Sequence, residues 1–413
     1  MKFFCYLQSI PLVSVSCISY NCNASSTCKK KKKKKKAIDP PPPPLCLATL
    51  YRSLHGLCES RKQMARRRVG FCLSDKKRRR MNLSAFADLC AGRGIDVVEI
   101  DLSQPMGSQG PFNVIVHKLS DVIVEAEYDS QSQELLSNFQ NYISAHPQTV
   151  LLDPLPAMTK LLDRFASYRI MSQLQNTVKD KSICCPPYLE INTSERSAIQ
   201  AAIQSKQLSY PLICKTRVAH GSCSHEMSLI FSEVGLCDVR PPCVLQSFVN
   251  HGAVLHKVFV VGDDHFTVER PSLKNFPPGP CDRSTIFFNS HDVSKPESSS
   301  HLTALDDSMP RLPPPSNEAM VALVRHLRAE LGMALFGVDV IVNIHTHTLT
   351  VIDINIFPGY EGVPQFFSSL LNYIESIMEK QEPLQPVVDP SLASTQPPSD
   401  CNETLCPAEG KTS

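Results

Sequence analysis

Alternating apolar and polar residues near the C-terminal end of the chain predict a β-hairpin. Two runs rich in β-branched residues, 335–343 and 349–362, flank a short polar loop. Because side chains alternate between the two faces of a strand, Asp353 and Asn355 point the same way. A loop centred on Thr346 places Asp339 directly opposite Asp353 on that face. The hairpin therefore gathers two carboxylates and one amide.

Earlier apolar patterns predict a small parallel α/β domain over residues 67–156. A strand, an amphipathic helix and two further strands follow one another at 68–74, 82–93, 95–101 and 114–116. The helix carries Leu83, Phe86 and Leu89 on one face. Strand, helix and strand at these spacings indicate a parallel sheet.

Two α+β lobes are predicted after this domain. The lobe at 157–250 has a helix around 158–174 and strands at 212–215, 228–231 and 244–249. The lobe at 251–382 has a strand at 256–261, a polar loop at 271–309, a helix at 316–331, the hairpin and a helix at 364–379. No apolar run is long enough to predict a transmembrane span.

Both ends of the chain are biased in composition. Residues 1–66 contain eight consecutive lysines and five consecutive prolines, and residues 383–413 are polar and rich in proline. We expect both ends to be disordered because they offer little apolar surface to bury. The first segment is also interpreted as a product of a start codon placed too far upstream. A cleaved signal peptide is the less favoured alternative for the apolar run in residues 1–20.

The net charge of +2 conceals an acidic body. Residues 1–68 hold 15 of the 42 lysines and arginines but only two acids, so that residues 69–413 carry 27 basic and 38 acidic side chains. A body of this charge excludes general binding to nucleic acid or to membranes, and an anionic substrate needs a local cluster of cations. The 17 cysteines include no CxxC pair, which favours reduced thiols in a cytoplasmic protein.

The acidic hairpin suggests a metal site. Asp339, Asp353 and Asn355 are expected to lie together without a basic neighbour, and such oxygen donors suit Mg²⁺ bridging to substrate phosphates. A solvated hairpin edge is the alternative, and the hairpin alone does not decide between the two.

Basic residues in the middle of the chain suggest a nucleotide site. Lys215 ends a strand and is followed by a loop of small residues, a layout that can place an ammonium on phosphates, although a lysine on an edge strand gives the same pattern. Residues 244–251 and the next strand with Lys257 suit an adenine slot. His220 and His225 are interpreted as solvated loop histidines. The P-loop and protein-kinase motifs are missing.

Taken together, these segments resemble the ATP-grasp fold, and within it the inositol 1,3,4-trisphosphate 5/6-kinase family. The resemblance covers about residues 68–382 and is carried by collinear motifs at 69–77, 117–121, 152–156, 161–164, 213–221, 270–276, 287–291, 293–300 and 353–362. It implies a small parallel α/β domain that binds inositol phosphate, followed by two α+β lobes that clamp ATP.

The resemblance also implies roles for particular residues. The ATP contacts are implied to be Arg164, Lys215, Gln246, Ser247, Phe248, Val249, Lys257, Ser272, Ser290 and Ser294. The inositol phosphate contacts are implied to be Lys77, Lys118, His225, Lys257, Asn355 and Gly359. Two Mg²⁺ ions are implied on Asp339, Asp353 and Asn355, and the catalytic residues are expected to be Lys257, Asp353 and Asn355.

The expected activity is transfer of phosphate from ATP, as co-substrate, to inositol 1,3,4-trisphosphate at positions 5 and 6 and to inositol 3,4,5,6-tetrakisphosphate at position 1. Reverse transfer to ADP, and so exchange between inositol phosphates, is also implied. We expect a cytoplasmic monomer. An ATP-grasp carboxylate–amine ligase and a non-catalytic inositol-phosphate sensor are the alternatives.

Overall fold

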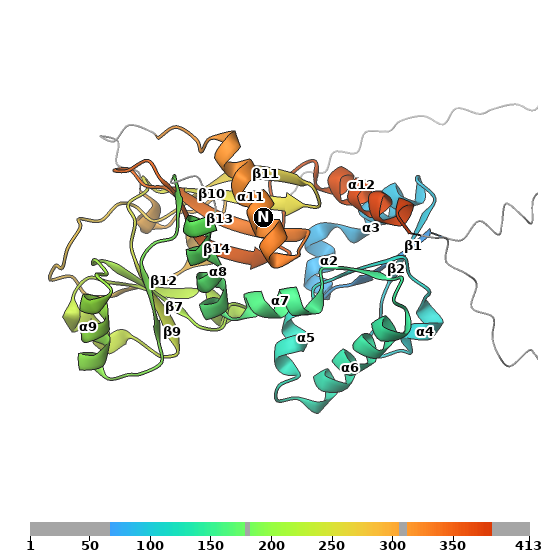
Figure 1. The fold of residues 1–413 in the computed structure, drawn as a ribbon, viewed down its shortest axis with the longest axis horizontal. Helices are drawn as coiled ribbons and strands as arrows, with labels where there is room; N and C mark the ends of the chain where they lie inside the picture. The colour runs from blue at the N-terminus through green and yellow to red at the C-terminus, as the bar shows by residue number, and fades with distance from the viewer. Residues whose placement is uncertain (1–66, 178–181, 305–311, 382–413) are drawn as a thin grey trace, which may run out of the picture. The chain divides into compact units, whose positions relative to one another are not determined.

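The computed structural model describes residues 67–177, 182–304 and 312–381, whose strands form three β-sheets (Figure 1). The predictions for residues 1–66 and 383–413 lie outside the described residues. The first sheet has the order β2-β1-β3-β4 and all its strands are parallel, as predicted. Its strands are β1 (Arg67–Cys72), β2 (Ile95–Glu99), β3 (Val114–His117) and β4 (Val150–Leu152).

Two consecutive helices follow β1, where the apolar pattern predicted one. The predicted helix corresponds to α3 (Leu83–Ala91), and the additional helix is α2 (Asp75–Met81). Ser74 begins α2 by accepting a hydrogen bond from the Lys77 N–H, and Asn82 separates the two helices with a positive φ of 55°. The other helices of this domain are α4 (Met106–Gln109), α5 (Ser120–Glu125) and α6 (Ser130–Ala145).

The second sheet is antiparallel, with the order β12-β8-β7-β9-β6. Its strands are β6 (Tyr188–Ile191), β7 (Leu212–Thr216), β8 (Glu226–Ile230), β9 (Cys243–Ser247) and β12 (Ile286–Asn289). Around it lie α9 (Arg196–Ser205), α10 (Ser290–Val293), η1 (Ser222–His225), η2 (Glu233–Asp238) and η3 (His301–Thr303). The expectation of one continuous loop at 271–309 is therefore wrong, since β12, α10 and η3 lie within it.

The third sheet has the order β11-β10-β13-β14-β5 and contains the predicted hairpin. Its strands are β5 (Ile183–Cys184), β10 (Val254–Val261), β11 (Asp264–Pro271), β13 (Leu335–Val342) and β14 (Leu349–Ile356). The associated helices are α7 (Leu155–Leu162), α8 (Arg164–Thr177), α11 (Asn317–Leu331) and α12 (Phe366–Glu379). The single helix expected around 158–174 is in fact α7 and α8, separated at Asp163.

The hydrophobic cores join segments that the linear division kept apart. Phe165 and Tyr168 of α8 pack with α11 and the third sheet, although α8 was assigned to the middle lobe. The red helix α12 lies beside the blue α3 and β1, and the rings of Phe86 and Phe367 are 5.3 Å apart (Figure 1). The sheets thus draw on interleaved stretches of chain, and the domain boundaries stay predictions.

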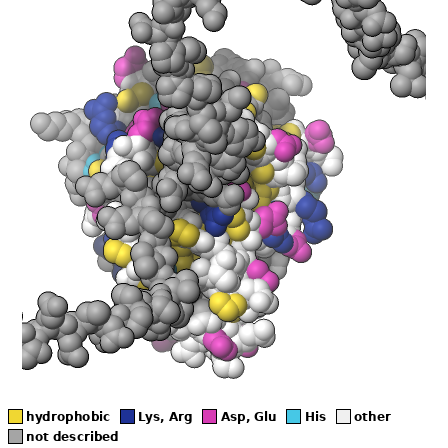
Figure 2. All heavy atoms as spheres, turned by 90° about the vertical axis from the view of Figure 1, so that its right-hand side faces the viewer, with side chains coloured by type: hydrophobic (Ala, Val, Ile, Leu, Met, Phe, Trp, Pro, Cys, Tyr) yellow, Lys and Arg dark blue, Asp and Glu magenta, His cyan; other side chains and the backbone are white. Residues whose placement is uncertain are grey.

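Surface and cysteine chemistry agree with the composition. Basic and acidic side chains are interspersed over the visible described part of the face in Figure 2, with no expanse of one sign. The cysteines in the described residues are all free. No helix in the described part of the chain is both long and apolar enough to cross a membrane.

Candidate functional site

One cleft, with a volume of about 800 Å³, is lined by the second and third sheets and, from the parallel domain, by α2 and the residues that follow β3. Nearly all the residues assigned from the sequence line it. They are Lys77, Lys118, Arg164, Lys215, His225, Gln246, Phe248, Val249, Lys257, Ser272, Ser290, Ser294, Asp339, Asp353, Asn355 and Gly359. The exception is Ser247, which is buried next to Gln246 and whose hydroxyl accepts a hydrogen bond from the Ser209 N–H at 3.0 Å. Alternation along β9 turns the Ser247 side chain away from the cleft.

The acidic hairpin has the predicted pairing, with Asp339 opposite Asp353 and Gly337 opposite Asn355. A bulge produces this register. Val342 pairs with Leu349, which centres the loop half a residue before Thr346, and the register then shifts by one residue between Asp339 and Val340.

The expectation that the acidic set lacks a basic neighbour is wrong. Lys257 faces Asp339 from β10, and its ammonium lies 3.1 Å from both carboxylate oxygens of Asp339. No group of three or more His, Cys, Asp or Glu residues in the described part of the chain could hold a metal ion. The hairpin offers two carboxylates and an amide instead, so any cation there depends on Asn355 as the third donor.

Two buried cations lie at the predicted nucleotide end of the cleft. The Lys215 ammonium donates to the carbonyl of Ile352, the residue left over by the bulge, at 2.8 Å. Burial lowers the pKa of Lys215 to about 8, although the nearby Asp353 opposes the shift. The Arg164 guanidinium donates to the Thr216 carbonyl and, at 3.3 Å, to the Ser224 carbonyl. Both cations are held by neutral acceptors and face the cleft, which suits phosphate.

Contacts with other protein side chains hold the residues of the predicted adenine wall in place. Gln246 is buried and accepts a hydrogen bond from the Tyr168 hydroxyl. Phe248 packs edge-on against Phe276, with ring centroids 5.5 Å apart. The Ser272 hydroxyl is 2.7 Å from Nε2 of the buried His251, so this serine has a protein partner in addition to the cleft.

Two lysines from the parallel domain converge on one backbone carbonyl at the other end of the cleft. The ammonium groups of Lys77 and Lys118 donate to the Phe357 carbonyl at 3.1 and 3.2 Å, and Lys77 also donates to the Pro358 carbonyl. Burial, followed by the charge of Lys118, lowers the pKa of Lys77 to about 6. Burial also lowers the pKa of Lys118. An anion bound here would raise the pKa of both lysines and so favour their charged forms.

His225 lies at the end of η1, within electrostatic reach of Asp353, Arg164 and Lys257. Its Nδ1 is 3.5 Å from the Ser290 hydroxyl, and its ring lies 5.7 Å from that of His291. Burial and the neighbouring His291 lower the pKa of His225. His220 and His225 both line the cleft, and His225 is exposed, so the solvated and the substrate-binding interpretations of His225 both stay predictions.

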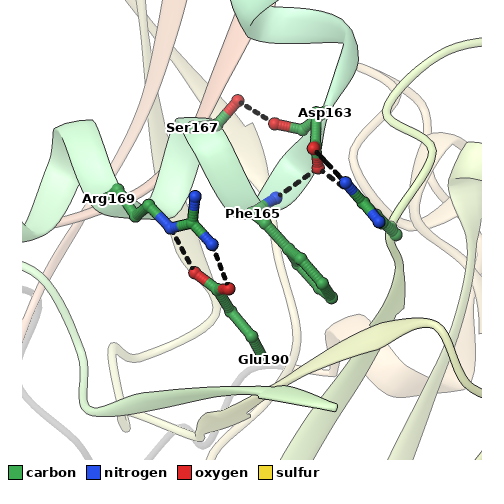
Figure 3. A network of polar contacts seen from close by, with 6 residues as sticks. Asp163, Phe165, Ser167, Arg169 and Glu190 are labelled. Carbon is green, nitrogen blue, oxygen red and sulfur yellow. Dashed lines mark hydrogen bonds and ion pairs between the residues drawn. The ribbon is translucent and has the colours of Figure 1, made fainter. Parts of the chain in front are cut away.

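The loop after β7 is attached to the junction between α7 and α8. Asp163 accepts the Phe165 N–H at 2.9 Å and the Arg217 guanidinium at 2.8 Å (Figure 3). The backbone adds hydrogen bonds from Arg164 N–H to the Arg217 carbonyl and from Ala219 N–H to the Leu162 carbonyl. Arg164 therefore enters the cleft at a point where two segments are held together.

Asp153 connects the parallel domain to the third sheet. Its buried carboxylate accepts the N–H groups of Ala334 and Leu335 at 2.7 and 2.9 Å, at the start of β13. Its backbone carbonyl lies 2.6 Å from Nε2 of His117, the residue before Lys118. The motif at 152–156 thus fixes the domain that supplies the cleft lysines.

The sequence reasoning did not select several other charged residues that line the cleft, among them Arg80, Arg270 and Glu361. Arg80 pairs with Glu361 at 2.7 Å. Its spacing of three residues from Lys77 was the available signal, because both then share one face of α2. Because residues 76–80 are all basic, this spacing did not distinguish a helix that faces a cleft from one that faces only solvent.

Comparison with known proteins gives a consistent result. A family model described as the inositol 1,3,4-trisphosphate 5/6-kinase ATP-grasp domain matches residues 177–376, and one for the pre-ATP-grasp domain of the same kinase matches residues 68–158. The inositol-tetrakisphosphate 1-kinase of Xenopus laevis is 50% identical over 341 residues, covering 82% of this chain and 85% of that protein. That of Danio rerio is 51% identical over 316 residues, covering 76% and 80%.

Among solved structures, the macrocyclase MdnC bound with its precursor peptide MdnA, from Microcystis aeruginosa, superposes with a TM-score of 0.50. The identity is 14%, and the match covers 76% of this chain and 99% of the macrocyclase. At this identity the likeness concerns the fold alone, which is ATP-grasp.

Proposed function

Since the chain belongs to the inositol 1,3,4-trisphosphate 5/6-kinase family, it is an ATP-dependent inositol phosphate kinase, and we propose which acceptors it uses and which residues act. The acceptors are inositol 1,3,4-trisphosphate, phosphorylated at positions 5 and 6, and inositol 3,4,5,6-tetrakisphosphate, phosphorylated at position 1. The carrying observation is that Lys77 and Lys118 line one cleft together with the acidic hairpin, Lys215 and Arg164. We also propose reverse transfer to ADP, as the family resemblance implies.

The chain's own residues act mainly by positioning. Lys215 and Arg164 hold the phosphates of ATP, and the wall from Gln246 to Val249 holds its base, with Ser247 contributing only through its backbone. Lys77, Lys118 and His225 hold phosphates of the acceptor so that a ring hydroxyl faces the γ-phosphate. Phosphoryl transfer through a loose transition state requires little covalent work from the protein.

We infer that Asp339, Asp353 and Asn355 would hold magnesium. The donors fit because they line the cleft and consist of the oxygen atoms that Mg²⁺ prefers. When bound, the metal neutralises charge on the β- and γ-phosphates. Lys257 already neutralises Asp339, so its ammonium is available in the cleft when that carboxylate takes another partner.

Neither alternative activity is favoured by the cleft. A carboxylate–amine ligase needs cations for one or two carboxylates, whereas Lys77, Lys118, His225 and Lys257 suit several phosphates. A non-catalytic sensor has no use for the acidic hairpin. The predictions of a monomer and of the cellular location stay predictions.

The test is an incubation of the full chain with ATP, Mg²⁺ and separate inositol phosphate isomers, with products resolved by anion-exchange chromatography. We expect new, more highly phosphorylated products from the two named acceptors and ADP formed in equal amount. ATP turnover that requires an amine and a carboxylate, or tight binding of inositol phosphates without any turnover, would overturn the proposal.

A further inference from the structure

Arg80 and Glu361 lie at the acceptor end of the cleft and have no role in the account above. Arg80 is on α2, three residues beyond Lys77, and both line the cleft. Its Nη2 donates to Oε1 of Glu361 at 2.7 Å. Both side chains are 47% exposed, so the pair is open to exchange with a ligand.

Cations outnumber anions around this pair. The charge of Arg80 lowers the pKa of both Lys77 and Lys118, whereas the charge of Glu361 raises the pKa of both, so all four groups lie within electrostatic reach. Asp121 is the other acid that raises the pKa of Lys118. Lys77 and Lys118 donate to backbone carbonyls, not to carboxylates. Arg80 therefore shares its single carboxylate with two lysines that have no acidic hydrogen-bond partner among the described contacts.

Glu361 lies beside residues 357–359, the segment whose carbonyl groups accept hydrogen bonds from the two lysines. Its backbone carbonyl accepts the Arg270 guanidinium at 2.6 Å. A Cβ atom added to Gly359 would lie 2.0 Å from Oε1 of Glu361, so the carboxylate rests directly against this glycine. A negative group is thus placed beside Arg80, next to the lysines expected to bind phosphate.

We propose that Arg80 is a further phosphate-binding residue for the inositol polyphosphate and that the Glu361 carboxylate occupies its place until substrate displaces it. This inference rests on the proposed function and deepens it. In the proposed function Lys77, Lys118 and His225 bind three phosphates of the acceptor, and Arg80 binds a fourth. A guanidinium can bind a phosphate through two parallel hydrogen bonds, so Arg80 favours tetrakisphosphate acceptors over trisphosphates.

The test compares Arg80→Gln with Arg79→Gln in the full chain. Arg79 is the neighbouring exposed residue on α2 and does not line the cleft, so the two variants lose the same charge from the same helix. For Arg80→Gln we expect the KM for inositol 3,4,5,6-tetrakisphosphate to rise about 10- to 100-fold, as for loss of a hydrogen bond between charged groups. The KM for inositol 1,3,4-trisphosphate should rise less, and that for ATP should change less than about twofold. Arg79→Gln should resemble the wild type.

Two further variants complete the design. Glu361→Gln removes the competing charge and should lower the KM for the tetrakisphosphate, whereas Arg80→Lys keeps one charge and should recover part of the lost affinity. Calorimetric binding of the tetrakisphosphate gives a readout independent of turnover. Equal KM values for Arg80→Gln and Arg79→Gln, or a raised KM in Glu361→Gln, would refute the inference while the wild type still phosphorylates inositol phosphates. A wild type without such turnover refutes the proposed function instead.

Discussion

Replacing Lys77 with methionine separates binding from stability at one residue. Lys77 is buried, and its ammonium donates to the Phe357 carbonyl at 3.1 Å and lies 3.9 Å from the centroid of the Phe357 ring. Methionine keeps most of the apolar stem and removes the charge. The substitution therefore tests whether this ammonium is present for the acceptor phosphates or for the fold.

The substitution should weaken the binding of inositol phosphate and, at the same time, increase the stability of the fold. A hydrogen bond to a charged group is worth about 1.5–3 kcal/mol, so the KM for inositol phosphate should rise about 10- to 150-fold. Because we assign the nucleotide phosphates to Lys215 and Arg164 in the proposed function, we expect the KM for ATP to stay within about twofold. The pKa of Lys77 falls from 10.5 to about 6 on folding. At pH 8 this costs about 3 kcal/mol, whereas the lost hydrogen bonds contribute about 1 kcal/mol each. The variant should therefore be more stable than the wild type.

The stability gain also depends on pH. The folded pKa of this amine lies below its unfolded value, so between about pH 6 and 10.5 the unfolded chain binds more protons. The wild type consequently loses stability as the pH falls through that window, and the advantage of the methionine variant should widen from pH 9 to pH 7.

Urea unfolding at several pH values, together with steady-state kinetics for both substrates, measures these quantities. Lys160→Met is the matched control, since Lys160 is exposed on α7 and outside the cleft lining. A Lys77→Met protein that is less stable, with equal changes in the two KM values, would show that Lys77 serves the fold and would refute the assignment.

Three further predictions concern the metal site, the protonation of Lys77 and residues 1–66. Asp353→Asn should lower turnover at least about 100-fold without lowering the melting temperature, because the Lys257–Asp339 pair does not include Asp353; near-normal turnover at ordinary magnesium would contradict the metal assignment. Inositol phosphate binding at pH 7.5 should take up protons, because phosphate raises the pKa of Lys77 from about 6, and calorimetric heats that are equal in buffers of different ionisation enthalpy would oppose this. A chain of residues 67–413 should match the full chain in melting temperature and activity, and loss of either would show that residues 1–66 contribute.

Long, regular patterns were readable from the sequence, whereas short or charged elements were not. The hairpin and the parallel sheet were predicted because their alternation extends over whole strands. Helix α2 was missed because its run of lysines and arginines has no apolar period, although Lys77 and Met81 are buried. The break between α7 and α8 was missed because Asp163 leaves the helical conformation to cap α8 through its carboxylate, a local hydrogen bond that apolar periodicity does not report.

In the site, local register could be predicted but the arrival of distant side chains could not. Asp339 and Asp353 were matched correctly, yet only because the bulge at Ile352 compensates for a loop centred half a residue earlier. Lys257 was identified through family resemblance, but its pairing with Asp339 depends on β10 lying beside β13, 82 positions apart in sequence. Sheet order of this kind is decided by packing between segments.

A series of hydrogen bonds connects Lys77 and Lys118 to the strand that carries Asp339. Asp153 accepts the Leu335 N–H at the start of β13, the Leu335 carbonyl accepts the Phe357 N–H at 3.0 Å, and the Phe357 carbonyl accepts both Lys77 and Lys118. Asp153 and the two lysines belong to the parallel domain, whereas Leu335 and Phe357 belong to the hairpin region. A shift of one part against the other would therefore break the series at buried groups, at a cost of about 1–3 kcal/mol for each unsatisfied partner. Lys77, Lys118 and the acidic hairpin are consequently held by one shared framework, and the proposed in-line transfer requires such fixed positions.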